Sequence, residues 1–194
     1  MSGQTEPIVF VLLLAIVLVL VVGAVTWGKG VTQQNIDAAR LAAAEQFVFD
    51  LDKKIQNIAK ESGMEVIEYK LDMPIDIIDN CTANQPYVLD KCIQISGQTS
   101  LTLPEYWIYL NTPNKEKFGG FNDSASIIRE IKEGNIFRIQ LFYRIREGVN
   151  YTIDIQRSGA TLTPSLIYIE NVGIENRIIG TEKYVVTNIK MTFQ

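Results

Sequence analysis

IVFVLLLAIVLVLVVGAVTW, residues Ile8–Trp27, is a run of twenty residues without a charged side chain. At about 1.5 Å per residue, a helix of this length spans about 30 Å, the thickness of a bilayer hydrocarbon core. The run is apolar on every side of such a helix, whereas a surface helix has one apolar stripe. A single segment in lipid can satisfy its own backbone only as a helix. The stretch therefore predicts a helix that lies in a membrane or among other apolar helices.

A cleaved secretory signal peptide is the alternative interpretation of this segment. Such a peptide begins with basic residues, has a shorter apolar core and ends at small residues. Here the preceding residues, MSGQTEP, include no Lys or Arg, the apolar run is longer, and Trp27-Gly28-Lys29-Gly30 does not resemble a cleavage site. We therefore expect the segment to be retained.

Helical spacing continues beyond Trp27. No proline occurs between Val31 and Gly63, and polar residues such as Asp37 and Arg40 are expected on the solvent side. Apolar residues recur at steps of 7, 4, 4, 4 and 3, at Ile36, Ala43, Phe47, Leu51, Ile55 and Ile58. This spacing predicts a helix, and a glycine such as Gly63 is typical just after a helix end. We expect one helix from about residue 8 to residue 62, weakest at its internal glycines.

From Met64 onward the apolar period changes from 3.6 to 2. The alternation is clearest in residues 137–145, 151–155 and 185–193. Strands with one polar face are typical of antiparallel sheets. The turn at Glu147-Gly148 predicts that the first two of these strands form a hairpin. Residues 123–132 are predicted as one short helix.

These patterns predict an α+β fold in two parts. Residues 1–62 form an N-terminal helix, hydrophobic first and amphipathic later, and residues 63–194 form an antiparallel β head domain. We expect this head to be a β-sandwich, because its strands alternate and no βαβ pattern is present.

Composition excludes several classes of function. The 194 residues include 18 Lys and Arg, 22 Asp and Glu and no His, and the net charge of −4 argues against a nucleic-acid partner. Without His there is no Ser-His-Asp or Cys-His catalysis and no histidine metal centre. Neither a Walker sequence nor G-x-G-x-x-G follows a predicted strand. We expect no enzyme activity and no cofactor. Because Asp and Glu are plentiful, the composition does not exclude a hydrolase that uses a pair of catalytic carboxylates, but no pair stands out in the sequence.

Four aspartates close to one another raise the question of calcium. They lack the Asp-x-Asp-x-Asp-Gly spacing of a calcium loop, and strand alternation and turns explain them more simply. These residues are Asp72, Asp76, Asp79 and Asp90. We therefore expect no metal site.

Cysteines and sequons bear on the compartment of the head. Cys81 and Cys92 have ten residues between them and, outside the cytoplasm, would form a disulfide that stabilises the fold by about 3 kcal/mol. In the cytosol two such cysteines would more often be separate thiols. Asn80, Asn122 and Asn150 each begin an Asn-x-Ser/Thr sequon in a predicted loop or turn. Three sequons are a mild excess over chance, and we expect them to be glycosylation sites if the head is exported.

Gly3-Gln4-Thr5-Glu6-Pro7, followed by the apolar run, resembles the N terminus of archaeal type IV pilin-like proteins, the family with class III signal peptides. The resemblance implies that a prepilin peptidase removes a short leader, with Gly3 and Gln4 as the processing position. It also implies a long helix leading into a β head, and an apolar segment kept as the core of a filament. Glu6 matches the family's glutamate that meets the N-terminal amine of a neighbouring subunit.

The chain departs from this family at its start, because no basic residue precedes the apolar run. We expect either that the chain is shown after trimming or that its leader is only three residues. Cleavage after Gly3 would make Glu6 the third mature residue, and loss of Met1 alone would make it the fifth. The positive-inside rule, applied to Lys29 and Arg40, would place the head in the cytoplasm. The sequons, the cysteine pair and the resemblance favour export instead.

The expected function is therefore a structural subunit of an archaeal type IV pilus-like surface filament, acting in adhesion or surface attachment. The expected partners are copies of the chain in a helical homopolymer, the membrane before assembly, the prepilin peptidase and the pilus assembly machinery. The expected location is the cell surface, in an extracellular filament. The alternative is a monomeric membrane-anchored cell-envelope protein, such as a stator-like component of an archaeal motility machine. A membrane-anchored enzyme or solute-binding module is a further alternative.

Overall fold

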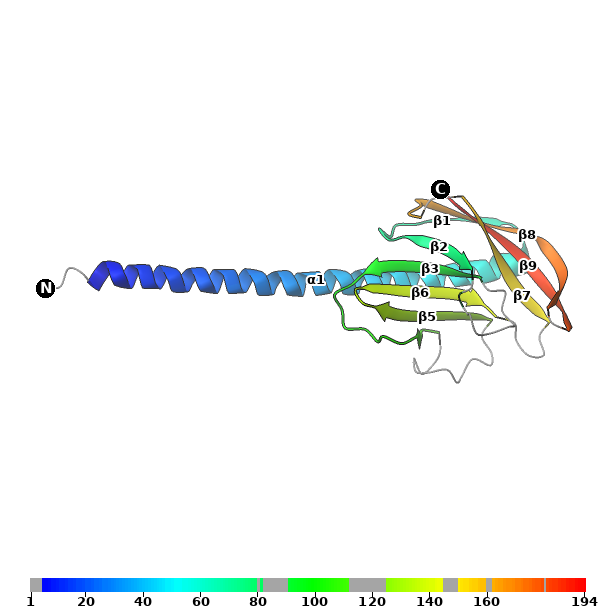
Figure 1. The fold of residues 1–194 in the computed structure, drawn as a ribbon. Helices are drawn as coiled ribbons and strands as arrows, with labels where there is room; N and C mark the ends of the chain where they lie inside the picture. Colours follow the sequence, from blue (N-terminus) through cyan, green and yellow to red (C-terminus); the bar gives the residue numbers. More distant parts are fainter. Residues whose placement is uncertain are drawn as a thin grey trace.

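The computed structural model describes residues 5–79, 81, 91–111, 125–144, 150–159, 162–179 and 181–194. One long helix, α1 (Thr5–Glu61), leads into a β head (Figure 1). About half of the helix, its N-terminal part, extends beyond the head without contact to any strand that the structure describes. The fold is α+β, as predicted. The strands of the described chain are β1 (Met64–Glu68), β2 (Ile75–Asp79), β3 (Lys91–Gln98), β4 (Ile108–Tyr109), β5 (Ser126–Glu133), β6 (Ile136–Tyr143), β7 (Tyr151–Ser158), β8 (Leu166–Ile179) and β9 (Glu182–Phe193).

The single long helix predicted from the sequence is confirmed. α1 is continuous through its internal glycines and ends at Glu61. Ser62 and Gly63 then adopt φ of 60° and 113°, and the Ser62 N–H donates to the Ile58 carbonyl at 2.9 Å. Glycine adopts positive φ without steric cost, so Gly63 lets the chain turn directly from the helix into β1.

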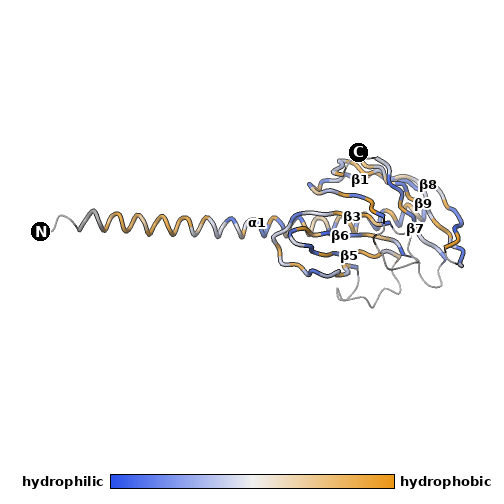
Figure 2. Tube along the Cα trace, viewed as in Figure 1, coloured by the Kyte–Doolittle hydropathy of each residue, from blue (hydrophilic) through white to orange (hydrophobic). Residues whose placement is uncertain are grey.

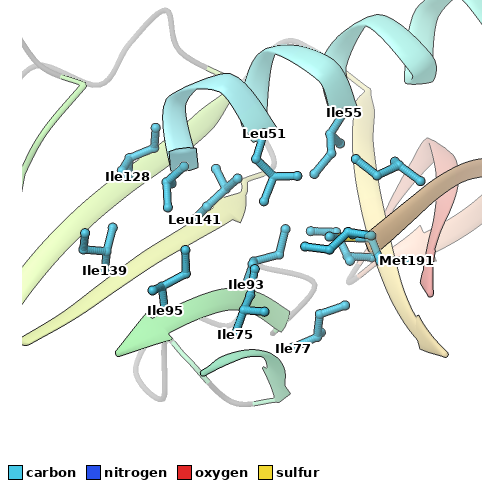
Figure 3. Packing of buried hydrophobic residues seen from close by; sticks show 14 of the residues in the cluster. Leu51, Ile55, Ile75, Ile77, Ile93, Ile95, Ile128, Ile139, Leu141 and Met191 are labelled. Atoms are coloured by element: carbon cyan, nitrogen blue, oxygen red, sulfur yellow. The ribbon is translucent and has the colours of Figure 1, made fainter. Parts of the chain in front are cut away.

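Two sheets and the second half of α1 enclose one core. The sheet orders are β1-β8-β9-β7 and β2-β3-β6-β5-β4. Leu51 and Ile55 of α1 point into the space between the sheets, toward Leu141 on one side and Met191 on the other (Figure 3). The helix therefore supplies part of the core of the head.

Strand pairing differs from the predicted hairpin. β6 pairs with β3 and β5, whereas β7 lies in the other sheet beside β9. The β7–β9 pair is parallel, and the other pairs in the described sheets are antiparallel. The predicted β6–β7 hairpin is therefore wrong. Alternation in the sequence shows which face of a strand is apolar, but it does not show which strand lies beside it.

The predicted helix at residues 123–132 is also wrong over its described part. Ser126–Glu133 is β5, which pairs with β6 along its whole length. A two-residue turn joins the strands, and its first residue, Gly134, has φ of 62°. Isoleucines three and four apart suit a helix, but β-branched side chains and a Gly-Asn turn favour a hairpin.

The side of α1 that faces the head is rotated from the predicted stripe. Leu51, Ile55 and Ile58 are buried as expected, whereas Ile36 is 43% exposed and Ala43 is exposed. The buried positions alternate in steps of four and three, at Asp37, Leu41, Ala44, Val48, Leu51, Ile55 and Ile58. Alternating steps hold one direction on a helix of 3.6 residues per turn, whereas repeated steps of four drift around it.

Candidate functional site

The N-terminal half of α1 is apolar along most of its length (Figure 2), and its large apolar side chains are uncovered in the described chain. Its large apolar side chains from Val9 to Val25 are between 49% and 72% exposed, and Trp27 is 74% exposed. None of its most apolar window is buried within the described chain, and the helix is long and apolar enough to cross a membrane. Uncovered apolar surface of this extent marks a site that binds lipid or protein.

Asp37 fixes the other half of α1 to the head at the point where the two halves meet. Its carboxylate accepts hydrogen bonds from the Ser100 N–H and hydroxyl, both at 2.6 Å, and from the Gln33 amide at 2.8 Å. The expectation that Asp37 faces solvent is wrong, because it is only 3% exposed. The hydrogen bonds from Ser100 hold the pKa of the Asp37 carboxyl below its usual value.

Two further contacts hold the helix deeper in the head. The Asp52 carboxylate accepts hydrogen bonds from the Ser126 hydroxyl at 2.7 Å and the Tyr143 hydroxyl at 2.9 Å. Burial raises the pKa of Tyr143 well above its ordinary value, and the neighbouring Asp52 charge adds to this. Near the helix end, the Asn171 amide donates to the Ile58 carbonyl at 3.2 Å. Both sheets therefore hold α1 through polar contacts as well as through the core.

We expect Asp37→Ala to lower the free energy of unfolding of the head by about 2 kcal/mol, because it removes hydrogen bonds to a charged acceptor. The folded-state pKa of Asp37 is lowered, so its stabilising effect is present above the unfolded pKa of about 4 and is lost as the pH falls through the folded value. Chemical unfolding of parent and variant at pH 7 and pH 2 measures both effects.

Asp50→Ala is the matched control for this prediction. Asp50 is exposed on the same helix, and its carboxylate accepts a hydrogen bond from the Gln46 amide at 3.1 Å, one turn away. Its removal is expected to change stability by less than about 0.5 kcal/mol. A cost of Asp37→Ala that stays the same at both pH values would contradict the proposed role of its carboxylate.

The structure contains a disulfide between Cys81 and Cys92, whose Cα atoms are 6.0 Å apart. Cys92 lies on β3 and is buried in a small apolar cluster with Tyr109, Ile127 and Phe142. Arg129 donates to the Cys81 carbonyl at 2.6 Å and stacks on the Trp107 ring, its guanidinium carbon 4.0 Å from the ring centroid. The disulfide thus fixes Cys81 to the outer face of the five-stranded sheet.

The remaining predicted sites are only partly described by the structure. Asn150 is exposed just before β7, as a glycan acceptor must be. Glu6 lies in the first turn of α1. Asn80, Asn122, Gly3 and Gln4 lie outside the described residues.

The acidic residues of the head do not gather into a metal site where the structure describes them. Asp76 pairs with Arg157 at 2.5 Å, and its carboxylate also accepts the Ile77 N–H at 2.7 Å. Within the described ranges there is no group of three or more His, Cys, Asp or Glu placed to hold a metal ion. Asp76 therefore joins β2 to β7 through its ion pair with Arg157.

Comparison of the chain with protein-family models, curated proteins and solved structures finds no match. Two properties define the candidate site: an apolar half-helix that needs a non-aqueous environment, and a head that holds the other half of the same helix. This arrangement can fix a head to a membrane, or join heads through their apolar helices.

Proposed function

We propose that this protein is a structural subunit of an archaeal type IV pilus-like surface filament. The observation that carries the proposal is the uncovered apolar half of α1, which continues without a break into the core of a folded head. In the filament these half-helices pack together as the core, and the β heads form an outer sheath. Before assembly the same segment lies in the membrane, and the finished filament serves adhesion or surface attachment.

Two features of the head support its export. The disulfide between Cys81 and Cys92 suits an oxidising compartment, and Asn150, the exposed first residue of its sequon, suits glycosylation. The positive-inside rule, applied to Lys29 and Arg40, favours a cytoplasmic head instead. These are only two basic residues, and the features above outweigh them. A surface location is therefore part of the proposal.

Electron microscopy of material sheared from the cell surface tests the proposal, with the subunit identified by mass spectrometry. We expect filaments composed of this chain. The second candidate is a monomeric membrane-anchored envelope protein, such as a stator-like component of a motility machine, because the apolar segment alone matches a bilayer in length. Surface material that holds this chain only in membrane fragments would favour the second candidate.

Glu6→Ala and Glu6→Gln are expected to lower filament yield sharply while membrane insertion and head folding stay intact. Among packed subunits the Glu6 carboxylate would need an amine partner, and loss of one partner of a buried ion pair costs about 3–5 kcal/mol. In a monomeric anchor the same carboxylate would reach water at the edge of the bilayer and contribute little. Filament yield per cell, compared with that of the parent, measures the difference.

Glu105→Gln is the control for Glu6, since it removes an exposed carboxylate from the head. Its yield should equal that of the parent. Equal yields from the parent and both Glu6 variants would remove the assembly role of this residue.

A further inference from the structure

Four charged residues of α1 form two pairs of equal spacing. Lys29 and Arg40 are eleven residues apart, and so are Asp50 and Glu61. Eleven residues are three turns of helix, so each pair lies on one face. All four side chains are exposed, and none of them makes an ion pair with another described residue.

A single offset brings the two pairs together. Asp50 follows Lys29 by 21 positions, and Glu61 follows Arg40 by the same number. In a helix, 21 residues span about 31 Å. Two parallel copies of α1 with this offset place both positive charges of one copy level with both negative charges of the other. Lys54, between Asp50 and Glu61, is already paired with Glu65 of its own chain.

The same offset also matches apolar surfaces. It sets Ile8–Trp27 of one copy beside residues 29–48 of the other. On the face that carries Asp50 and Glu61, this stretch has Ile36, which is 43% exposed. The same face carries two small exposed residues, Ala39 and Ala43. Small residues allow two helices to approach closely, so this stretch suits an apolar helix as its neighbour.

The length of the head fits this offset as well. The buried positions of α1 run from Asp37 to Ala59, a distance of 22 positions or about 33 Å along the helix axis. The head of one copy would therefore begin near the level where the head of its neighbour ends.

From these matches we propose that neighbouring copies in the filament are offset by 21 helical residues, with Lys29 and Arg40 of one copy binding Asp50 and Glu61 of the next. This contact rests on the proposed function and specifies how its subunits meet. It joins two different parts of the surface, so each copy keeps one part unused for a further copy. Heterologous contacts that do not close generate open filaments instead of dimers.

Charge reversal tests the contact. Lys29→Glu with Arg40→Glu makes both pairs negative, and Asp50→Lys with Glu61→Lys makes both positive. Each double variant is expected to lose at least tenfold in filament yield. A mixture of the two is expected to recover most of the yield, because opposite charges then meet at every contact.

Lys53→Glu with Lys60→Glu is the matched control. These two lysines are exposed on another side of the same helix, and their reversal changes the net charge as much as the first double variant does. The yield of this control should stay within twofold of the parent. Circular dichroism of each variant shows whether the head remains folded.

A second measurement uses the parent chain without substitution. A zero-length reagent that couples amines to carboxylates should link Lys29 to Asp50 in assembled filaments, as identified by mass spectrometry. These residues are about 31 Å apart within one copy, so the link can form only between copies. Parent filaments that lack this link, or reversed variants that assemble like the parent, overturn the contact alone. A parent that forms no filaments overturns the proposed function and the contact with it.

Discussion

A chain that begins at Gln33 is expected to be soluble and folded, and to form no filaments. It lacks the apolar half of α1 but keeps Gln33, which donates to Asp37, and all helix residues buried in the head. Complete loss of assembly is expected because the segment proposed as the filament core is gone. Sedimentation and electron microscopy measure assembly, and circular dichroism should show a β-rich head that unfolds cooperatively.

The parent chain, handled in detergent and then assembled under the same conditions, is the control for this truncation. Filaments formed by the truncated chain would show that Ile8–Trp27 is not their core. Loss of the folded head would instead contradict the packing of the second half of α1 described above.

Ile55→Asp is expected to unfold the head. Ile55 is fully buried between the two sheets, where the introduced carboxylate would lie among apolar side chains (Figure 3). A buried charge without a partner costs about 4–5 kcal/mol or more, which is comparable to the whole stability of many domains. Limited proteolysis and circular dichroism measure the loss of folded protein.

Asn57→Asp controls for the added charge, since Asn57 is exposed two residues further along the helix. Its stability should change by less than about 0.5 kcal/mol. The loss of stability in Ile55→Val should lie between those of Ile55→Asp and Asn57→Asp, at about 1 kcal/mol. An Ile55→Asp variant as stable as the parent would show that α1 does not belong to the core.

Local patterns were sufficient to predict the long helix and the β head. An uncharged run, the absence of proline and Gly63 are all features of neighbouring residues, and they define α1 and its end. Sheet order depends on contacts between distant segments, and alternation in β6 and β7 says nothing about their partners. The parallel pairing of β7 with β9 is therefore visible only in the structure.

The polar contacts of the helix were not predictable for a related reason. The charge of Asp37 favours the solvent side of the helix, although its position continues the buried row one step before Leu41. Its partner Ser100 lies 63 residues away, and Tyr143 lies 91 residues from Asp52. A buried carboxylate depends on such distant donors, which the spacing of the helix does not reveal.

The unbroken course of α1 has a mechanical consequence in the proposed filament. A tensile load would enter each subunit through the uncovered half of α1 and continue along the same rod into the head, without crossing a linker. The sheets would bear this load as shear along the side of α1. The contacts that share it extend along the helix from Asp37, which binds Ser100, to Ile58, which binds Asn171. A sheet strained in this way could separate from α1 while the helix itself stayed intact. The filament would then remain continuous.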